Sequence, residues 1–120
     1  MNPGDALLVA LGAAVGAPLR HLVDHRIRTR LGGTPAAGTL AVNVAGSFVL
    51  GVVVGADLGT APMALVGIGF CGAFTTFSAL ALQVWDAMAQ DRYPHAVANI
   101  ALSLTLGLAA AWLGWVLAGA

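Results

Sequence analysis

Asn43 lies in the middle of a long apolar stretch and is the first polar side chain to consider as a functional residue. Thr39 and Ser47 stand four residues before and after it, which puts the three polar side chains on one face of a helix. An amide offers two N–H donors and one acceptor oxygen. Asn43 could therefore bind an anion, or it could join two helices by hydrogen bonds. Both interpretations stay open.

A second stretch, from Gly69 to Ser78, reads GFCGAFTTFS. Gly72 and the pair Thr75–Thr76 weaken a helix, because glycine adds backbone freedom and threonine has few rotamers. A break would free carbonyl oxygens, which can hold a cation, and would create a new helix N-terminus, which favours an anion. We predict a break here. The alternative is a continuous helix whose threonines hydrogen-bond to the preceding turn.

Further candidate residues flank these two stretches. The ring of Phe77 has an electropositive edge that could help to hold a small anion, although Phe70, Phe74 and Phe77 at helical spacing also suit a packed core. Asn99 and Ser103 lie four residues apart on one helix face. They could join helices or line a pathway.

The composition makes such polar groups informative. Of the 120 residues, 59% are hydrophobic and only 8% are charged, whereas a soluble domain has about 25% charged residues. No charge occurs between Arg30 and Asp57, between Asp57 and Asp86, or after Arg92. Each of these gaps exceeds the roughly 20 residues that cross a bilayer as a helix. The sequence predicts one compact integral membrane domain over residues 1–120.

We expect an all-α membrane protein with four transmembrane helices, separated by loops that carry charges, glycine or proline. The third helix should be interrupted around residues 72–78. Glycine pairs at four-residue spacing, Gly12 with Gly16 and Gly51 with Gly55, allow close helix packing and favour a dimer over a lone chain. The expected helices span residues 3–23, 36–56, 63–90 and 95–117.

The arginines predict an orientation. Four spans place the loops with Arg26, Arg28, Arg30 and Arg92 on one side of the membrane, and the other side has no Lys or Arg. The positive-inside rule therefore puts these two loops in the cytoplasm and both chain ends outside.

Several classes of function are disfavoured. The helix interiors contain no Glu, Asp or Lys, and no nucleophile elbow, phosphate-binding loop or His/Cys/carboxylate cluster appears, so an enzyme is not expected. A net charge of zero without a basic patch argues against nucleic acid. The alternative to a channel is a small four-helix proton-coupled multidrug-type exporter, which needs a membrane-embedded carboxylate that the first helix lacks between Asp5 and Arg20.

Three motifs resemble the Fluc/CrcB family of bacterial fluoride ion channels: Gly16–Arg20, residues 38–48 (GTLAVNVAGSF) and Gly69–Ser78. The resemblance covers the whole chain. It implies passive fluoride export across the bacterial cytoplasmic (inner) membrane, which lowers intracellular fluoride. It also implies an antiparallel dimer in the lipid bilayer, in which a second Fluc/CrcB subunit lies inverted beside the first, with two pores between the subunits.

The resemblance also implies roles for individual residues. A structural sodium ion at the dimer interface would be held by the backbone carbonyls of Gly72 and Thr75. The pore asparagine would be Asn43 and the first pore phenylalanine Phe77, while Arg20 would be the vestibule arginine of the first helix. The remaining residues implied to face the pore are Thr76, Ser78, Asn99 and Ser103.

One departure from the family pattern concerns the second pore phenylalanine. Leu80 stands in its place and Ala79 replaces a neighbouring hydroxyl residue. Leucine lacks an electropositive ring edge. The chain is also strongly biased in its arginines, which suits one orientation better than two. We therefore hypothesise that it forms one half of a heterodimer with an oppositely oriented paralogue, rather than a homodimer.

Overall fold

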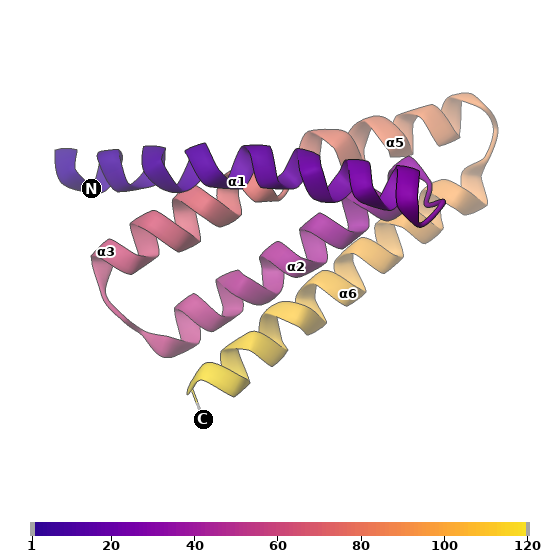
Figure 1. Cartoon of the computed structure of the whole chain (residues 1–120). Helices are drawn as coiled ribbons and strands as arrows, with labels where there is room; N and C mark the ends of the chain where they lie inside the picture. The colour runs from indigo at the N-terminus through magenta and orange to yellow at the C-terminus, as the bar shows by residue number, and fades with distance from the viewer. Residues whose placement is uncertain (1, 120) are drawn as a thin grey trace.

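The computed structural model describes residues 2–119, and within that range four helical segments are long and apolar enough to cross a membrane. They form an elongated bundle of 46 × 30 × 27 Å (Figure 1). The predicted all-α architecture with four spans is confirmed. The segments are Pro3–Arg30, Pro35–Ala56, Thr60–Ala89 and Tyr93–Gly119.

Helix α1 (Pro3–Arg30) is longer than the sequence suggested. Its start is fixed by a capping box, in which Asn2 and Asp5 each accept a hydrogen bond from the backbone N–H of the other. The prediction that this helix ends near residue 23 is wrong. Asp24 and Arg28 form an ion pair of 3.0 Å one turn apart, which supports the helix through the charged region until Gly32, at φ 66, ends it.

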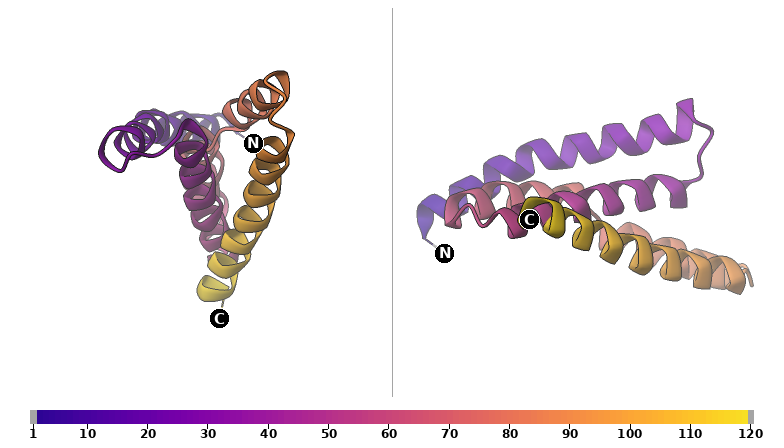
Figure 2. Two further views of the ribbon diagram at one scale, coloured as in Figure 1. Left: turned by 90° about the vertical axis from the view of Figure 1, so that its right-hand side faces the viewer. Right: turned by 90° about the horizontal axis from the view of Figure 1, so that it is seen from below.

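Helices α2 (Pro35–Ala56) and α6 (Tyr93–Gly119) lie side by side over most of their lengths (Figures 1 and 2). Their backbones approach closely where glycines remove side chains: Gly51 faces the carbonyl of Ala111, and Gly114 faces the carbonyl of Phe48 at the next crossing point. Such contacts are the usual means of helix association in lipid. Helix α6 starts two residues before the predicted residue 95.

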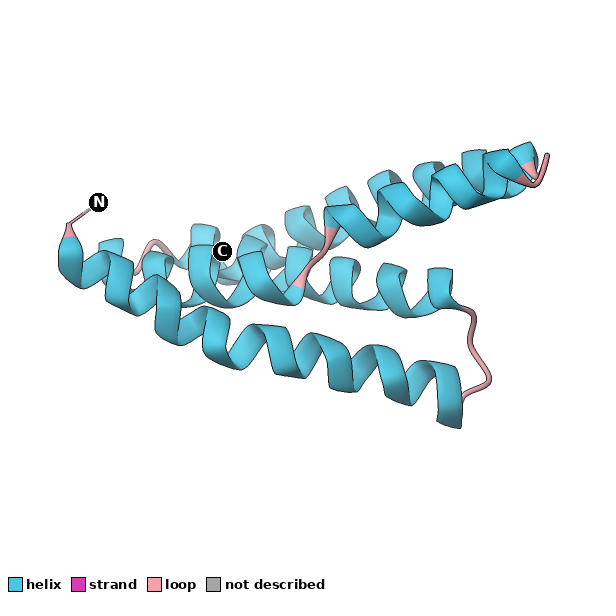
Figure 3. Cartoon of the chain, turned by 90° about the horizontal axis from the view of Figure 1, so that it is seen from above, coloured by secondary structure: helices cyan, strands magenta, loops and turns pink. Residues whose placement is uncertain are grey.

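The third segment is broken, as predicted, but the break is short. The third segment consists of α3 (Thr60–Pro62), the π-helix η1 (Met63–Cys71), α4 (Gly72–Phe74) and α5 (Phe77–Ala89). Only Thr75 and Thr76 are extended, and Gly72 keeps a helical backbone at φ −61 and ψ −35. Figure 3 shows the loop between the two long pieces. The glycine therefore contributes little to the unwinding, and the two threonines form the break.

Helix α1 packs against η1 through Gly12 and Gly16, whose missing side chains leave room for the backbone of Leu65 and Phe70. This close packing is what holds the first half of the broken segment. The second half, α5, has no buried residue and packs against α6 instead. The break therefore falls where the third segment leaves α1 and crosses to α6.

We predict that Gly51→Ala destabilises the fold while Gly107→Ala does not. A methyl group at residue 51 would collide with the carbonyl of Ala111, whereas one at residue 107 would meet only Ser47 Oγ, at 3.7 Å. Overpacking costs about 1–3 kcal/mol, and alanine in place of helical glycine gains about 1 kcal/mol. Thermal unfolding in detergent micelles should show a lower midpoint for Gly51→Ala only. Equal midpoints for the two variants would contradict this account of the interface.

Candidate ion pathway at the helix break

Asn43 of α2 binds both backbone groups of Thr76. The Thr76 N–H donates to Asn43 Oδ1 at 2.7 Å, and Asn43 Nδ2 donates to the Thr76 carbonyl oxygen at 3.0 Å. The extended backbone of Thr76, at φ −148 and ψ 119, presents both groups on the same side. Because Nδ2 carries two hydrogens, one N–H donor of Asn43 is not used by Thr76.

At Thr75 the helix is not continuous, so the alternative to a break is wrong, although the hydroxyl does bond to the preceding turn. The Thr75 hydroxyl donates to the Cys71 carbonyl at 2.8 Å, the back-bonding expected of a continuous helix, yet the chain becomes extended at this residue. The methyl group of Thr75 occupies the space that the missing side chain of Gly46 leaves on α2. The break is therefore positioned against α2 by packing at Thr75 and by hydrogen bonds at Thr76.

Carbonyl oxygens at the break lose their helical partners, among them those of Gly72 and Thr75. In an unbroken helix the Gly72 carbonyl would accept from the N–H of Thr76, and the Thr75 carbonyl from the N–H of Ala79. Here the Thr76 N–H donates to Asn43, and the Ala79 N–H donates to Thr76 Oγ1 at 3.2 Å. Gly72 and Thr75 therefore present freed backbone oxygens, the ligand type that suits a hard cation such as sodium.

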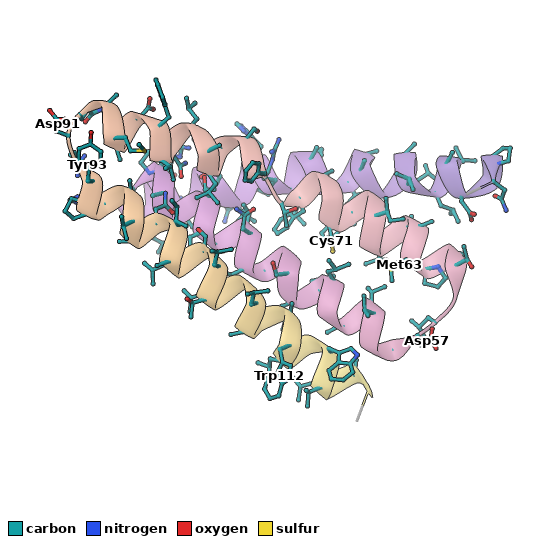
Figure 4. The ribbon with its side chains drawn as sticks, turned by 180° about the vertical axis from the view of Figure 1, so that it is seen from behind. Asp57, Met63, Cys71, Asp91, Tyr93 and Trp112 are labelled. Atoms are coloured by element: carbon teal, nitrogen blue, oxygen red, sulfur yellow. The ribbon has the colours of Figure 1, made fainter. Side chains whose placement is uncertain are left out.

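A cavity of about 500 Å³ opens beside the break, between α2 and the third segment. Cys71 points from the third segment toward α2 here (Figure 4). Phe77 stands at its edge with 79% of its surface exposed, and Leu80 also reaches it. Among the residues that the structure describes, the polar groups that line this cavity are all uncharged. The polar or glycine residues that line it include Asn43, Gly46, Ser47, Gly72, Thr75 and Thr76.

A smaller cavity, of about 190 Å³, lies on the other side of Thr76, toward the last turns of α1. Arg20 lines it together with Thr39, Asp24 and Arg28. Thr76 is the one residue that borders both cavities among those the structure describes. The predicted vestibule arginine is thus separated from the Asn43 cavity by the break itself.

The other expected pore residues are placed differently. Ser78 is exposed and its hydroxyl lies 3.3 Å from Thr76 Oγ1, so it belongs to the break. Asn99 borders a different cavity of about 370 Å³ at the arginine-bearing end, and Ser103 Oγ lies 3.4 Å from Asn99 Oδ1. Within a single chain, the structure does not bring these two residues of α6 to the Asn43 cavity.

Gln83 was missed by the sequence analysis. Its Nε2 donates to Thr39 Oγ1 at 2.8 Å and to the Pro35 carbonyl at 3.2 Å, which ties α5 to the start of α2. Its Oε1 is buried without a hydrogen-bond partner in the described part of the chain. A polar side chain within a membrane helix is a signal that could have identified it.

The comparisons with known proteins agree with this architecture. The family model described as CrcB-like protein, Camphor Resistance (CrcB), matches residues 7–115. "Fluoride-specific ion channel FluC 2" of Mycobacterium tuberculosis H37Rv is 44% identical over 124 residues, covering 97% of this chain and 98% of that protein. "Fluoride-specific ion channel FluC 1" of Nocardia farcinica is 36% identical over 105 residues, covering 88% of this chain and 74% of that protein.

A third relative, "Fluoride-specific ion channel FluC 1" of Symbiobacterium thermophilum, is 43% identical over 117 residues, covering 92% of this chain and 94% of that protein. The family match, these identities and the four membrane-length helices lead to one conclusion: the chain is a multi-pass membrane protein that belongs to the CrcB-like family.

Proposed function

We propose that the chain is a subunit of a fluoride-specific channel that lets fluoride leave the bacterial cell passively. The names of its relatives support this activity. The observation that carries the proposal in this chain is the break itself, where Asn43 holds Thr76 and the exposed ring of Phe77 stands beside the resulting polar cavity. The multidrug-type exporter is not favoured by these comparisons.

Fluoride must shed water in such a site and needs hydrogen-bond donors in return. The second N–H of Asn43 and the hydroxyls of Thr76 and Ser78 can donate, and the Phe77 ring edge adds a weak positive potential. None of these groups carries a full charge, so the ion is held loosely enough to leave. Conduction of this kind makes and breaks no covalent bond, and the proposed function is not enzymatic.

A second subunit would complete the pathway. The cavity beside Asn43 is open on one side, and most of the surface of Phe77 is exposed there. An inverted partner packed on this face would cover both. It could also supply the polar residues Asn99 and Ser103, which lie away from Asn43 within one chain.

A sodium ion at the centre of this dimer would be bound by the freed carbonyls of Gly72 and Thr75. Two inverted copies would bring two such pairs together, which gives four oxygen ligands. Binding would stabilise the contact between subunits by joining them through one ion, and it would neutralise the carbonyl dipoles of the break. The structural support for this site is that the N–H groups of Thr76 and Ala79 donate to side chains instead of to the carbonyls of Gly72 and Thr75.

The first test measures fluoride efflux from liposomes. Asn43→Asp should lower the flux about tenfold or more, because a fixed negative charge within about 4 Å of an anion costs several kcal/mol at protein dielectric. Phe77→Ile should lower it as well, since the ring edge is lost. Unchanged flux in both variants would remove these residues from the pathway.

Phe70→Ile is the matched control for Phe77→Ile. Phe70 stacks on Phe74 with ring centroids 5.3 Å apart and borders an apolar groove rather than the Asn43 cavity. The same chemical change there should preserve most of the flux. If both substitutions reduce the flux equally, the effect reports on packing of the third segment.

The second test addresses the cation. Sodium should raise the thermal midpoint of the full-length dimer in detergent, whereas potassium or choline at the same ionic strength should not, because the larger ions fit a closed set of carbonyls poorly. The measurement is a salt titration of unfolding. An identical response to all three salts would show ionic strength alone and would count against a specific site.

The third test distinguishes a homodimer from a heterodimer. Expressed alone in fluoride-sensitive bacteria, this chain should restore little resistance, because its arginines gather at one end of the bundle, which disfavours the inverted orientation, and because Leu80 lacks a ring. Co-expression with an oppositely biased paralogue should restore full growth. Full resistance from this chain alone would refute the heterodimer.

A further inference from the structure

The last turns of α1 carry a charged face that the proposed channel does not use. Residues 20–30 contain four of the five arginines of the chain and continue as helix to Arg30. They lie at the same end of the bundle as the turn between α5 and α6, which carries Arg92 (Figure 1). We call residues 22–30 the basic arm.

The arginines of the basic arm divide between two faces. Arg28 pairs with Asp24, whose carboxylate fits against Gly38 of α2, and both line the small cavity beside Thr76. Arg26 and Arg30 lie on the opposite side of the helix, are exposed, and form no ion pair within residues 2–119. Two arginines are thus free to meet something outside the chain.

The face that carries Arg26 and Arg30 is continuous with an apolar stripe. Val15, Leu19 and Leu22 precede them at helical spacing and are 59%, 36% and 48% exposed. In a membrane such exposed residues face lipid chains. The stripe therefore changes from apolar side chains to arginines between Leu22 and Arg26, one turn apart.

The length of α1 places this change at the membrane surface. From Pro3 to Leu22 the helix rises about 30 Å, which equals the thickness of the hydrocarbon core. Arg26 is one further turn along, at the depth of the lipid headgroups. Beyond it Leu31 is 78% exposed, and exposed apolar residues among arginines are typical of a segment that rests in the interface rather than in water.

We propose that the basic arm binds anionic phospholipid headgroups through Arg26 and Arg30. The partner is a lipid with a net negative headgroup, such as phosphatidylglycerol, because charge complementarity favours it over zwitterionic lipids. The apolar stripe below would contact the acyl chains of the same lipid. The proposal is independent of fluoride conduction, since neither arginine borders the cavities at the break.

The test uses native mass spectrometry of the full-length protein with equal amounts of phosphatidylglycerol and phosphatidylcholine. The unmodified protein should retain more of the anionic lipid. Arg26→Gln should reduce that preference about fivefold at low ionic strength, as expected for one surface arginine. Arg30→Gln provides a second, independent variant on the same face.

Arg28→Gln is the matched control, because it removes the same formal charge from the same helix but from the face that points to Asp24 and α2. It should change the lipid preference less than twofold. Equal retention of the two lipids by the unmodified protein would overturn the proposal. So would a loss in Arg28→Gln as large as in Arg26→Gln, because only net charge would then matter.

Discussion

The paired hydrogen bonds between Asn43 and the main chain of Thr76 are the constraint on which the site depends. A backbone N–H or C=O left unpaired in lipid costs several kcal/mol, so a helix can unwind at membrane depth only where other groups replace its hydrogen bonds. Here Asn43 Oδ1 replaces the helical acceptor that the Thr76 N–H has lost, and Asn43 Nδ2 adds a second bond, to the Thr76 carbonyl oxygen. Its value lies less in the strength of each bond, which averages about 0.6 kcal/mol in membrane proteins, than in the penalty it avoids.

This interaction makes the position of α2 decisive for the geometry of the third segment. Asn43 reaches Thr76 because Gly46, on the next turn, lets Thr75 pack against the same helix. Helix α2 is in turn fixed to α6 by the close approach at Gly51 and Gly114. These glycines therefore determine where the freed carbonyls of the break and the Phe77 ring are presented.

The four spans and the break were predictable because they depend on local properties: the length of uncharged stretches, and the low helix preference of Thr75 and Thr76. The end of α1 was not predictable in this way, because a dense run of charges usually indicates a loop, whereas here the Asp24–Arg28 pair extends the helix. The partner of Asn43 and the role of Gln83 depend on which helix faces meet. Helical periodicity does not specify which faces meet. For Asn43, the sequence alone therefore could not distinguish anion binding from a hydrogen bond that joins two helices.

Charge and polarity are divided along the molecule in a way that suits passive movement of an anion. The arginines of the described residues lie toward one end, where Arg20 borders the small cavity, while the break offers amide, hydroxyl and ring-edge dipoles. An arginine in the middle of the path would hold fluoride too tightly for release, whereas dipoles offset part of the dehydration cost and let the ion go. Thr76, which borders both cavities, lies between the cavity lined by arginines and the neutral polar groups beside Asn43.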